Sequence, residues 1–314
     1  MSGSDVILSG EILPASDQAT PTLSEEDLAA LRRAVQALER PGLAARLSAA
    51  AGTPIELIGR SLPAPVMDVV AKSTESALRA AIRVALATLP KESAAEGDPS
   101  VLPVTQPKGE NRFMRLIGSG DGKHRAMAAV SGALGGAFGL ATIAVELPVS
   151  TTLMLRSIAE IAREEGEEIG TPEGALACIQ VFALGGGKLA TSADTGSTLT
   201  ESGYFAVRAA LAKTMAEAAK YAGTIALADQ SGPALMRFAA QVAARFGIVV
   251  SEKVAAQAVP ILGAVGGAAV NTVFMSHFQT TARAHFTIRR LERRYGAPAV
   301  RAAYEIEKAA LGPA

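Results

Sequence analysis

Alanine and glycine dominate this 314-residue chain and most strongly constrain its fold. The sequence contains 64 Ala and 30 Gly, which carry almost no side chain, whereas aromatic residues make up only 4% and Trp is absent. A β-sandwich or barrel needs β-branched and aromatic strands, and the sequence has neither that content nor the alternation. The glycines follow no period of three, which excludes collagen, and a hydrophobic content of 49% excludes global disorder. The composition therefore predicts an all-α protein whose helices pack unusually closely.

Charged residues are balanced, and cysteine is rare. Lys plus Arg and Asp plus Glu number 30 each, so no global field would draw the chain to nucleic acid or anionic lipid. Cys178 is the single cysteine and cannot form an internal disulfide, which is typical of a reducing compartment. Residues 1–19 lack a basic segment followed by an apolar run, so no signal peptide is predicted. We therefore expect a cytoplasmic protein without a nucleic-acid partner.

Turn-forming residues divide the chain into three parts. Residues 1–21, rich in Ser, Pro and Asp, are predicted to be a flexible tail. Residues 22–60 are expected to be an N-terminal helical extension, beginning with N-caps and acidic residues. Residues 61–314 are predicted to be the main helical domain, interrupted at 90–110 by a loop dense in Pro and Gly. Within these parts, helices are expected at about 28–40, 43–51, 63–89, 123–147, 149–166, 172–186, 200–223, 233–245, 248–276, 278–295 and 297–310.

Two long segments carry no acidic or basic residue, namely the 20 residues 126–145 and the 29 residues 254–282. About 20 apolar residues suffice for a helix to span a bilayer. Ala and Gly contribute little to insertion, however, and the second segment contains Asn271, His277 and Gln279, which lipid would not satisfy. A buried core helix and a membrane-embedded or interfacial helix are both consistent with these segments.

A short glycine-rich motif occurs twice. The sequence GALGGA at 132–137 recurs as GAVGGA at 263–268, and each copy opens a long apolar helix that a second helix follows. The repetition predicts a compact bundle built around two related glycine-zipper, helix–bend–helix units. Spacing of this kind lets two helices cross closely, either within one chain or as a dimerisation groove in a membrane. The candidate close-packing glycines are Gly132, Gly135, Gly136, Gly139, Gly263, Gly266 and Gly267.

Glu146 and His277 occupy matching positions, fourteen residues after the first glycine of each copy. Pro148 disfavours a continuous helix and predicts a kink just after Glu146. Because a buried imidazole needs a partner, we expect Glu146 and His277 to pair in the core. A catalytic role for Glu146, His277 and His285 is the alternative. The two histidines are separated by about 12 Å along one helix, so neither a metal site nor a cofactor is predicted.

Opposite charges gather at the ends of the two units. The first end carries Glu160, Glu164, Glu165, Glu167, Glu168 and Glu173, and the second carries Arg283, Arg289, Arg290, Arg293 and Arg294. The two ends would neutralise each other if they lay side by side. Otherwise both faces are solvated, or the basic face contacts anionic lipid headgroups through Arg289, Arg290, Arg293 and Arg294.

Four further polar residues are candidates for a ligand site or a polar core. Arg156 and Glu160 stand one helical turn apart, as an ordinary helix pair does. Asn271 and Gln279 lie within the second uncharged segment.

Two segments of the chain resemble the EcsC family, bacterial proteins named for the third gene of an ABC-transporter operon. They are GALGGAFGLATIAVELPVSTTLMLRSIAEIAREEG at 132–166 and VPILGAVGGAAVNTVFMSHFQTTARAHFTIRRLERRYG at 259–296. The resemblance covers about residues 60–305, and Glu146 stands where the family more commonly has Asp. It implies a helical fold without a settled activity. Some members carry hydrolase or peptidase labels, but these bring no catalytic residues to this chain.

The sequence favours a non-enzymatic helical protein that associates peripherally with the inner membrane, either with its lipid or with a membrane-protein partner. Its two long uncharged segments and its basic C-terminal face motivate this hypothesis. One alternative is a hydrolase with a Glu/His polar site, and another is a carrier of a lipid-like apolar ligand. The oligomeric state stays open.

Overall fold

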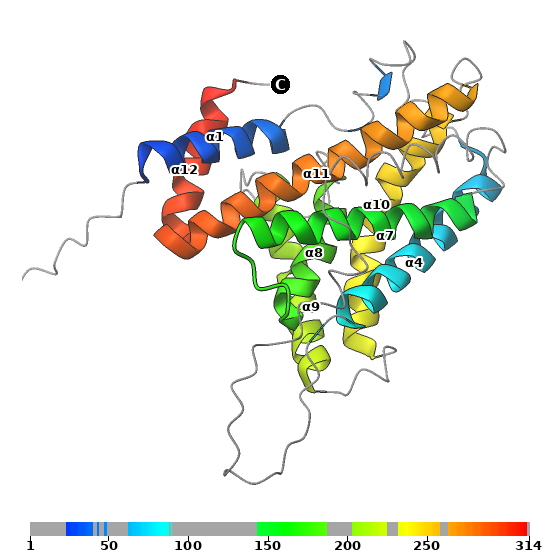
Figure 1. Ribbon diagram of the computed structural model, residues 1–314, viewed down its shortest axis with the longest axis horizontal. Helices are drawn as coiled ribbons and strands as arrows, with labels where there is room; N and C mark the ends of the chain where they lie inside the picture. Colours follow the sequence, from blue (N-terminus) through cyan, green and yellow to red (C-terminus); the bar gives the residue numbers. More distant parts are fainter. Residues whose placement is uncertain are drawn as a thin grey trace, which may run out of the picture.

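Eight helices and no strand make up the part of the chain that the structure describes (Figure 1). In this computed structural model the described residues are 23–39, 43, 47–48, 62–87, 89, 143–186, 203–224, 232–257 and 263–312. The helices are α1 (Glu25–Glu39), α4 (Ala64–Ala87), α7 (Ile143–Glu164), α8 (Pro172–Leu184), α9 (Gly203–Thr224), α10 (Pro233–Gln257), α11 (Gly263–Tyr295) and α12 (Ala297–Ala310). The predicted all-α fold is confirmed.

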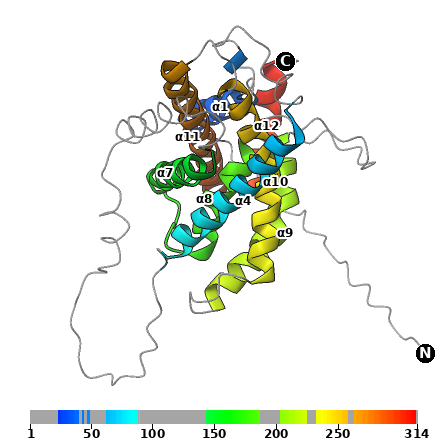
Figure 2. The same ribbon diagram turned by 90° about the vertical axis from the view of Figure 1, so that its right-hand side faces the viewer.

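Helix α11 runs the length of the bundle and contacts α1, α7, α8, α10 and α12 (Figure 1). Helices α1 and α12 pack on each other and on α11, while α4 packs on α7 and α10. The rotated view shows α7 and α11 side by side at one flank, and α9 with α10 at the other (Figure 2). Five of the seven other described helices therefore pack on one long central helix.

A cluster of phenylalanines fills the centre of the main core. Phe182, Phe246, Phe274 and Phe278 come from α8, α10 and α11 and are fully buried. Their ring centroids lie between 4.9 and 6.2 Å apart in tilted or edge-to-face pairs, which is the usual range for stabilising aromatic contacts. These four rings pack α8, α10 and α11 against one another at the centre of the core.

A second, smaller core joins the first helix to the last. Leu31 and Val35 of α1 pack with Tyr204 of α9, Ile288 of α11 and Tyr304 of α12, and all five are buried. Helix α1 thus shares its apolar face with the C-terminal helices. The expected tail at 1–21 and loop at 90–110 lie outside the described residues.

Three helix breaks that the sequence predicted are absent, in α7, α10 and α11. Helix α7 continues through Pro148 (Figure 1), where the sequence predicted a break. One missing N–H near the helix start costs a single hydrogen bond, and the side-chain oxygens of Ser150 and Thr152 donate to the carbonyls of Leu147 and Pro148. Helix α10 likewise runs through Gly247.

The second unit contains no bend. Helix α11 is a single helix of 33 residues, although the sequence predicted two helices meeting at His277. No Pro or Gly occurs between Ala268 and Tyr295, and polar side chains alone do not break a helix. Of the repeated glycines, Gly263, Gly266 and Gly267 lie at the start of α11, whereas Gly132, Gly135, Gly136 and Gly139 lie outside the described residues.

The start of α8 shows one place where only glycine fits. Thr171 caps the helix, since its Oγ1 accepts from the Gly174 amide at 3.1 Å, and Pro172 occupies the first helical position. A Cβ on Gly174 would overlap the backbone carbonyl of Glu168. We expect Gly174→Ala to lower the free energy of unfolding by about 1–3 kcal/mol, as overpacking does elsewhere.

The matched control is Gly247→Ala in the middle of α10, where a Cβ would meet nothing within 4 Å. This change should raise the free energy of unfolding by about 0.5–1 kcal/mol through helix propensity. Urea denaturation of both variants measures the difference. Equal effects from the two substitutions would contradict the tight approach at Gly174.

Candidate functional site

Glu146 pairs with a lysine and not with the expected histidine. The Lys253 ammonium donates to Glu146 Oε1 at 2.7 Å, joining α10 to α7, and the two residues are only 3% and 8% exposed. Lys253 Nζ also lies 4.9 Å from the centre of the Phe274 ring. The predicted Glu146–His277 pair is therefore wrong. An ammonium that reaches the same carboxylate compensates a buried negative charge better than a neutral imidazole does.

The surroundings of this pair are closed. Together with Leu147, Val254 and neighbouring residues, the pair borders a void of only about 10 Å³, which admits one water at most. Burial lowers the pKa of the Lys253 ammonium, while the Glu146 carboxylate acts against that shift. A buried ion pair of this kind holds α7 and α10 together, and the small void beside it leaves no room for a substrate.

His277 binds the end of α8. Its Nε2 lies 2.7 Å from the carbonyl oxygen of Gly185, and because a carbonyl can only accept, Nε2 carries the proton. The ring of Phe278 packs edge-on against the imidazole, with centroids 5.3 Å apart. His277 therefore satisfies a backbone carbonyl at the C-terminus of α8.

His285 belongs to a separate buried network. Its Nδ1 lies 2.9 Å from the hydroxyl of Tyr204, and the Arg208 guanidinium donates to that hydroxyl at 3.3 Å. Arg208 also makes two bonds, of 2.7 and 2.8 Å, to the Glu292 carboxylate. Burial, reinforced by Arg208 and Arg289, holds the pKa of His285 well below its usual value. Its imidazole is therefore neutral, and Nε2 is buried without a hydrogen-bond partner.

The three candidates for acid–base chemistry thus have different neighbours and form no common site. No group of three or more His, Cys, Asp or Glu side chains suited to a metal ion occurs among the described residues.

The remaining polar candidates also serve separate contacts. Gln279 Nε2 donates to the Ser157 hydroxyl at 2.8 Å, tying α11 to α7, and Asn271 is buried in α11. Arg156 has its Nε buried without a hydrogen-bond partner.

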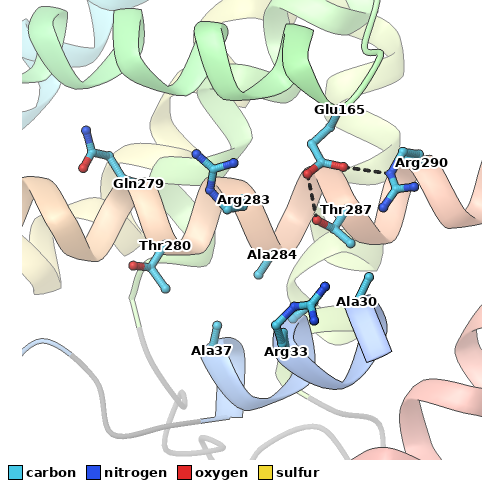
Figure 3. A pocket seen from close by; sticks show the side chains of 11 residues that line it. Ala30, Arg33, Ala37, Glu165, Gln279, Thr280, Arg283, Ala284, Thr287 and Arg290 are labelled. Carbon is cyan, nitrogen blue, oxygen red and sulfur yellow. Dashed lines mark hydrogen bonds and ion pairs between the residues drawn. The ribbon is translucent and has the colours of Figure 1, made fainter. Parts of the chain in front are cut away.

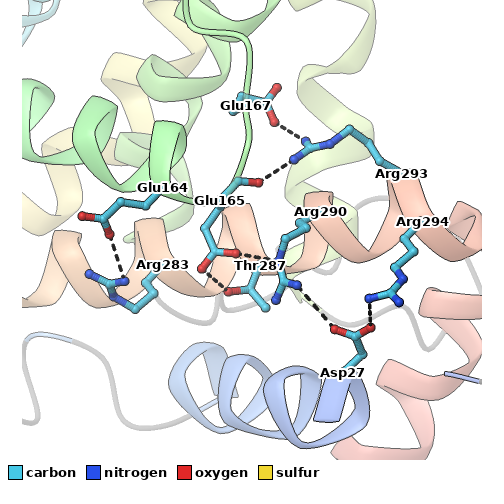
Figure 4. Close-up of polar contacts among 9 residues, drawn as sticks. All are labelled: Asp27, Glu164, Glu165, Glu167, Arg283, Thr287, Arg290, Arg293 and Arg294. Atoms are coloured by element: carbon cyan, nitrogen blue, oxygen red, sulfur yellow. Dashed lines mark hydrogen bonds and ion pairs between the residues drawn. The ribbon is translucent and has the colours of Figure 1, made fainter. Parts of the chain in front are cut away.

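The acidic and basic ends lie side by side and neutralise each other (Figure 4). Glu165, just after α7, accepts from Arg290 Nε at 2.8 Å and from the Thr287 hydroxyl at 3.1 Å. Glu167 binds both Arg289 and Arg293. The more exposed pair Glu164–Arg283 is longer, at 3.3 Å. The arginines of α11 therefore do not form a free basic face.

Asp27 extends this cluster to the first helix (Figure 4). Its carboxylate accepts from Arg294 and from the Tyr295 hydroxyl, both at 2.8 Å, and lies 3.4 Å from Arg290. Burial alone would raise the pKa of the Asp27 carboxyl. The hydrogen bonds from Tyr295 and Ser24, together with the two arginines, nevertheless hold that pKa below its ordinary value. Nothing in the local sequence identified this contact, because its partners are more than 260 residues away.

Two pockets flank this half of α11. A pocket of about 390 Å³ lies between α1 and α11, next to the end of α7 (Figure 3). A larger one, of about 680 Å³, is bounded by α8, α9, α11 and α12. Alanines and Met215 line much of its wall, and Arg208, Arg289 and Glu292 at its rim already take part in ion pairs.

The opposite half of the bundle carries exposed apolar side chains. We call the exposed side chains of Met67 and Val69 on α4, Val145 and Val149 on α7, and Ile248 on α10 the apolar end. The helices that bear them are tied together by the Glu146–Lys253 pair and by a 3.8 Å contact from Ser251 to Met67.

Helix α10 is the one described helix that is long and apolar enough to cross a bilayer, with a mean hydropathy of 1.3 in its best window. Core helices of soluble proteins pass the same test, and Phe238, Val242 and Phe246 on α10 are buried in the main core.

Breaking the buried Glu146–Lys253 pair should lower the free energy of unfolding far more than breaking a surface ion pair. We expect Lys253→Met to lower the free energy of unfolding by about 3–5 kcal/mol, because it leaves the Glu146 carboxylate buried without its counter-ion. Adding Glu146→Gln should recover much of that loss, since no uncompensated charge then remains. Urea denaturation of the single and double variants measures this coupling.

Glu75→Gln is the control, because the Glu75–Arg79 pair on α4 is half-exposed and exposed pairs contribute less than about 1 kcal/mol. Strictly additive losses at positions 146 and 253 would argue against a coupled pair.

The Asp27 contacts should make part of the stability depend on pH. Because the folded-state pKa of Asp27 is lowered, its contribution is complete above the unfolded pKa of about 3.9 and is lost as the pH falls through the folded value. We expect Asp27→Asn to be less stable than the wild type at neutral pH, with the difference narrowing below about pH 4. Melting temperatures measured from pH 7 to pH 3 give the comparison, and a constant difference would contradict it.

The comparison with known proteins adds one finding to this geometry. The EcsC protein family matches residues 25–291, from the first residue of α1 to Leu291 in α11. The match begins earlier than the resemblance in the sequence indicated and takes in α1, which agrees with the packing of α1 on α11. No curated protein and no solved structure matches the chain. The chain belongs to the EcsC protein family.

Proposed function

We propose that this protein is non-enzymatic and associates peripherally with the cytoplasmic membrane, with the apolar end as its contact surface. The observation that carries the proposal is that five of the seven large apolar side chains exposed among the described residues lie on α4, α7 and α10, where α4 packs on both of the other helices. Val145 is 73% exposed, and Val149, one turn further along α7, is also exposed. Exposed apolar patches on folded proteins commonly mark protein or membrane contacts.

The residues around the apolar end also favour a membrane contact at this surface. The uncharged segment 126–145 leads directly into α7. Met67 and Val69 lie in the first two turns of α4 near the exposed Ala64 and Pro65, with the exposed Asp68 between them. A surface of this composition would enter the boundary between headgroups and acyl chains without needing anionic lipid.

The arginines of α11 support this role less well than the sequence indicated. Arg289, Arg290, Arg293 and Arg294 each bind a carboxylate of Asp27, Glu165 or Glu167. A surface whose charges are already paired offers little net attraction to anionic headgroups. We therefore place the membrane contact at the apolar end and expect it to be insensitive to salt.

The two alternative functions have weaker support. A hydrolase would need Glu146, His277 and His285 to converge, and each of them has its own structural partner. A carrier of a lipid-like ligand would use the 680 Å³ pocket, which is large enough for a small molecule. The paired charges at its rim favour neither an acyl chain nor a free headgroup.

We place the protein on the cytoplasmic side of the membrane. Its single cysteine, Cys178, is a buried free thiol, and burial raises the pKa of that thiol to about 12. Such a cysteine is inert, and a chain without disulfides suits a reducing compartment.

Liposome flotation tests the membrane contact. The wild-type chain should float with neutral phosphatidylcholine vesicles at both low and high salt. The double variant Val145→Glu/Val149→Glu should stay at the bottom of the gradient, because each exposed valine becomes a charge that resists insertion. A loss of bound protein of about tenfold or more is expected from the transfer cost of two charges.

The control is Ile306→Glu on α12, because Ile306 is 70% exposed but lies outside the apolar end. This variant should float like the wild type. The proposal is contradicted if the wild-type protein fails to float, or if Val145→Glu/Val149→Glu floats as well as Ile306→Glu.

A further inference from the structure

We propose that the pocket between α1 and α11 is a binding site for a phosphate group, carried either by a small phosphomonoester or by a lipid headgroup. The site is independent of the apolar end and requires no membrane. Its walls come from two helices far apart in sequence and from the residue that follows α7 (Figure 3).

Small side chains create the space. Ala30, Ala34 and Ala37 on α1 face Ala284 on α11 across the pocket, which has a volume of about 390 Å³. That volume lies near the lower limit for small-molecule sites and suits a phosphate with a short substituent. The buried side chains of Gln279 and Thr287 add polar groups to the wall.

The charge of the lining selects an anion. Three guanidinium groups, from Arg33, Arg283 and Arg290, line the pocket together with the single carboxylate of Glu165. Glu164 and Asp27 also pair with Arg283 and Arg290, so Arg33 supplies the uncompensated positive charge of the lining. A phosphate group brings three strong acceptor oxygens, so it can engage Arg33 together with donors that the other two arginines still have free.

Arg33 is the group that lacks a partner. It forms no ion pair or hydrogen bond with any described residue, whereas Arg32, its neighbour on α1, is bound to Glu307 at 2.7 Å. Figure 3 shows Arg33 reaching from α1 toward α11. Its planar guanidinium therefore keeps all of its donors for a bidentate contact with an oxyanion.

The other two arginines keep donors as well. Arg283 holds Glu164 through one long bond of 3.3 Å, which a stronger acceptor can replace. Arg290 uses Nε for Glu165 and Nη1 for Asp27, which leaves Nη2. The Glu165 carboxylate is itself held by Arg290 and Thr287, so its charge is largely compensated where an anion would enter.

Isothermal titration calorimetry on the full-length protein tests the site with inorganic phosphate and with glycerol 3-phosphate. Vesicles containing phosphatidic acid are tested separately by flotation. Saturable binding of at least one of these probes is expected. Arg33→Gln should weaken that binding by about tenfold or more, as the loss of a charge-assisted hydrogen-bond pair does.

Two further variants separate the pocket from general electrostatics. Arg79→Gln removes an exposed arginine on α4, outside the pocket, and should bind like the wild type. Ala37→Leu keeps the charge but fills the pocket, and should weaken binding.

The outcomes also identify the source of the phosphate. Binding of the soluble probes assigns a small phosphomonoester, and an Arg33-dependent gain of flotation on phosphatidic acid alone assigns a lipid headgroup. The proposal is overturned if none of the three probes binds, or if Arg33→Gln binds as tightly as Arg79→Gln. Val145→Glu/Val149→Glu should retain soluble phosphate binding, so the two proposals fail independently.

Discussion

The polar contacts of α11 hold the whole bundle in register. His277 binds the end of α8, Gln279 binds α7, and His285 and Glu292 bind the Tyr204 and Arg208 side chains of α9. In a core so rich in Ala, apolar contacts are small and similar to one another, so they resist sliding of one helix along another only weakly. A buried hydrogen bond has one correct geometry, and leaving it unmade is costly. The polar residues of α11 therefore specify which turn of each neighbour lies against it.

The described structure has two halves of opposite character. Toward the C-terminus of α11, carboxylates and guanidinium groups cancel within a few ångströms and tie α1 and the end of α7 to one face. At the apolar end the Glu146–Lys253 pair is buried, and the exposed aliphatic side chains lie beside the exposed Asp68 and Lys72 of α4. Exposed valines contribute nothing to folding, so this half has surface available for a contact that the isolated chain does not make.

Local signals predicted the elements well and the long-range partners poorly. The start of α8 follows from Thr171 and Pro172, and the ends of α1, α11 and α12 lie close to residues that cap or interrupt a helix. The continuity of α7 through Pro148 was missed, because its cost depends on how near the helix start the proline falls. The sequence predicted a break in α11 at the polar residue His277, whereas in the structure His277 binds the end of α8 and the helix is continuous. The partner of Glu146 was missed for a different reason. Lys253 stands at the edge of an uncharged segment, and no local pattern shows that α10 brings it to α7.

The chain closes on itself where its first and last helices meet. Arg32 of α1 makes two bonds to Glu307 of α12, at 2.7 and 3.0 Å, and the Tyr304 hydroxyl donates to Glu39 at 3.0 Å. Neither helix can fray from its terminus without uncovering the apolar face of the other. The two ends of the described chain thus act as one cooperative unit of local unfolding. Trimming either end exposes part of the same small core, so a fragment that stops where the family match stops, at Leu291, would keep the contact of α1 with α11 and lose its contact with α12.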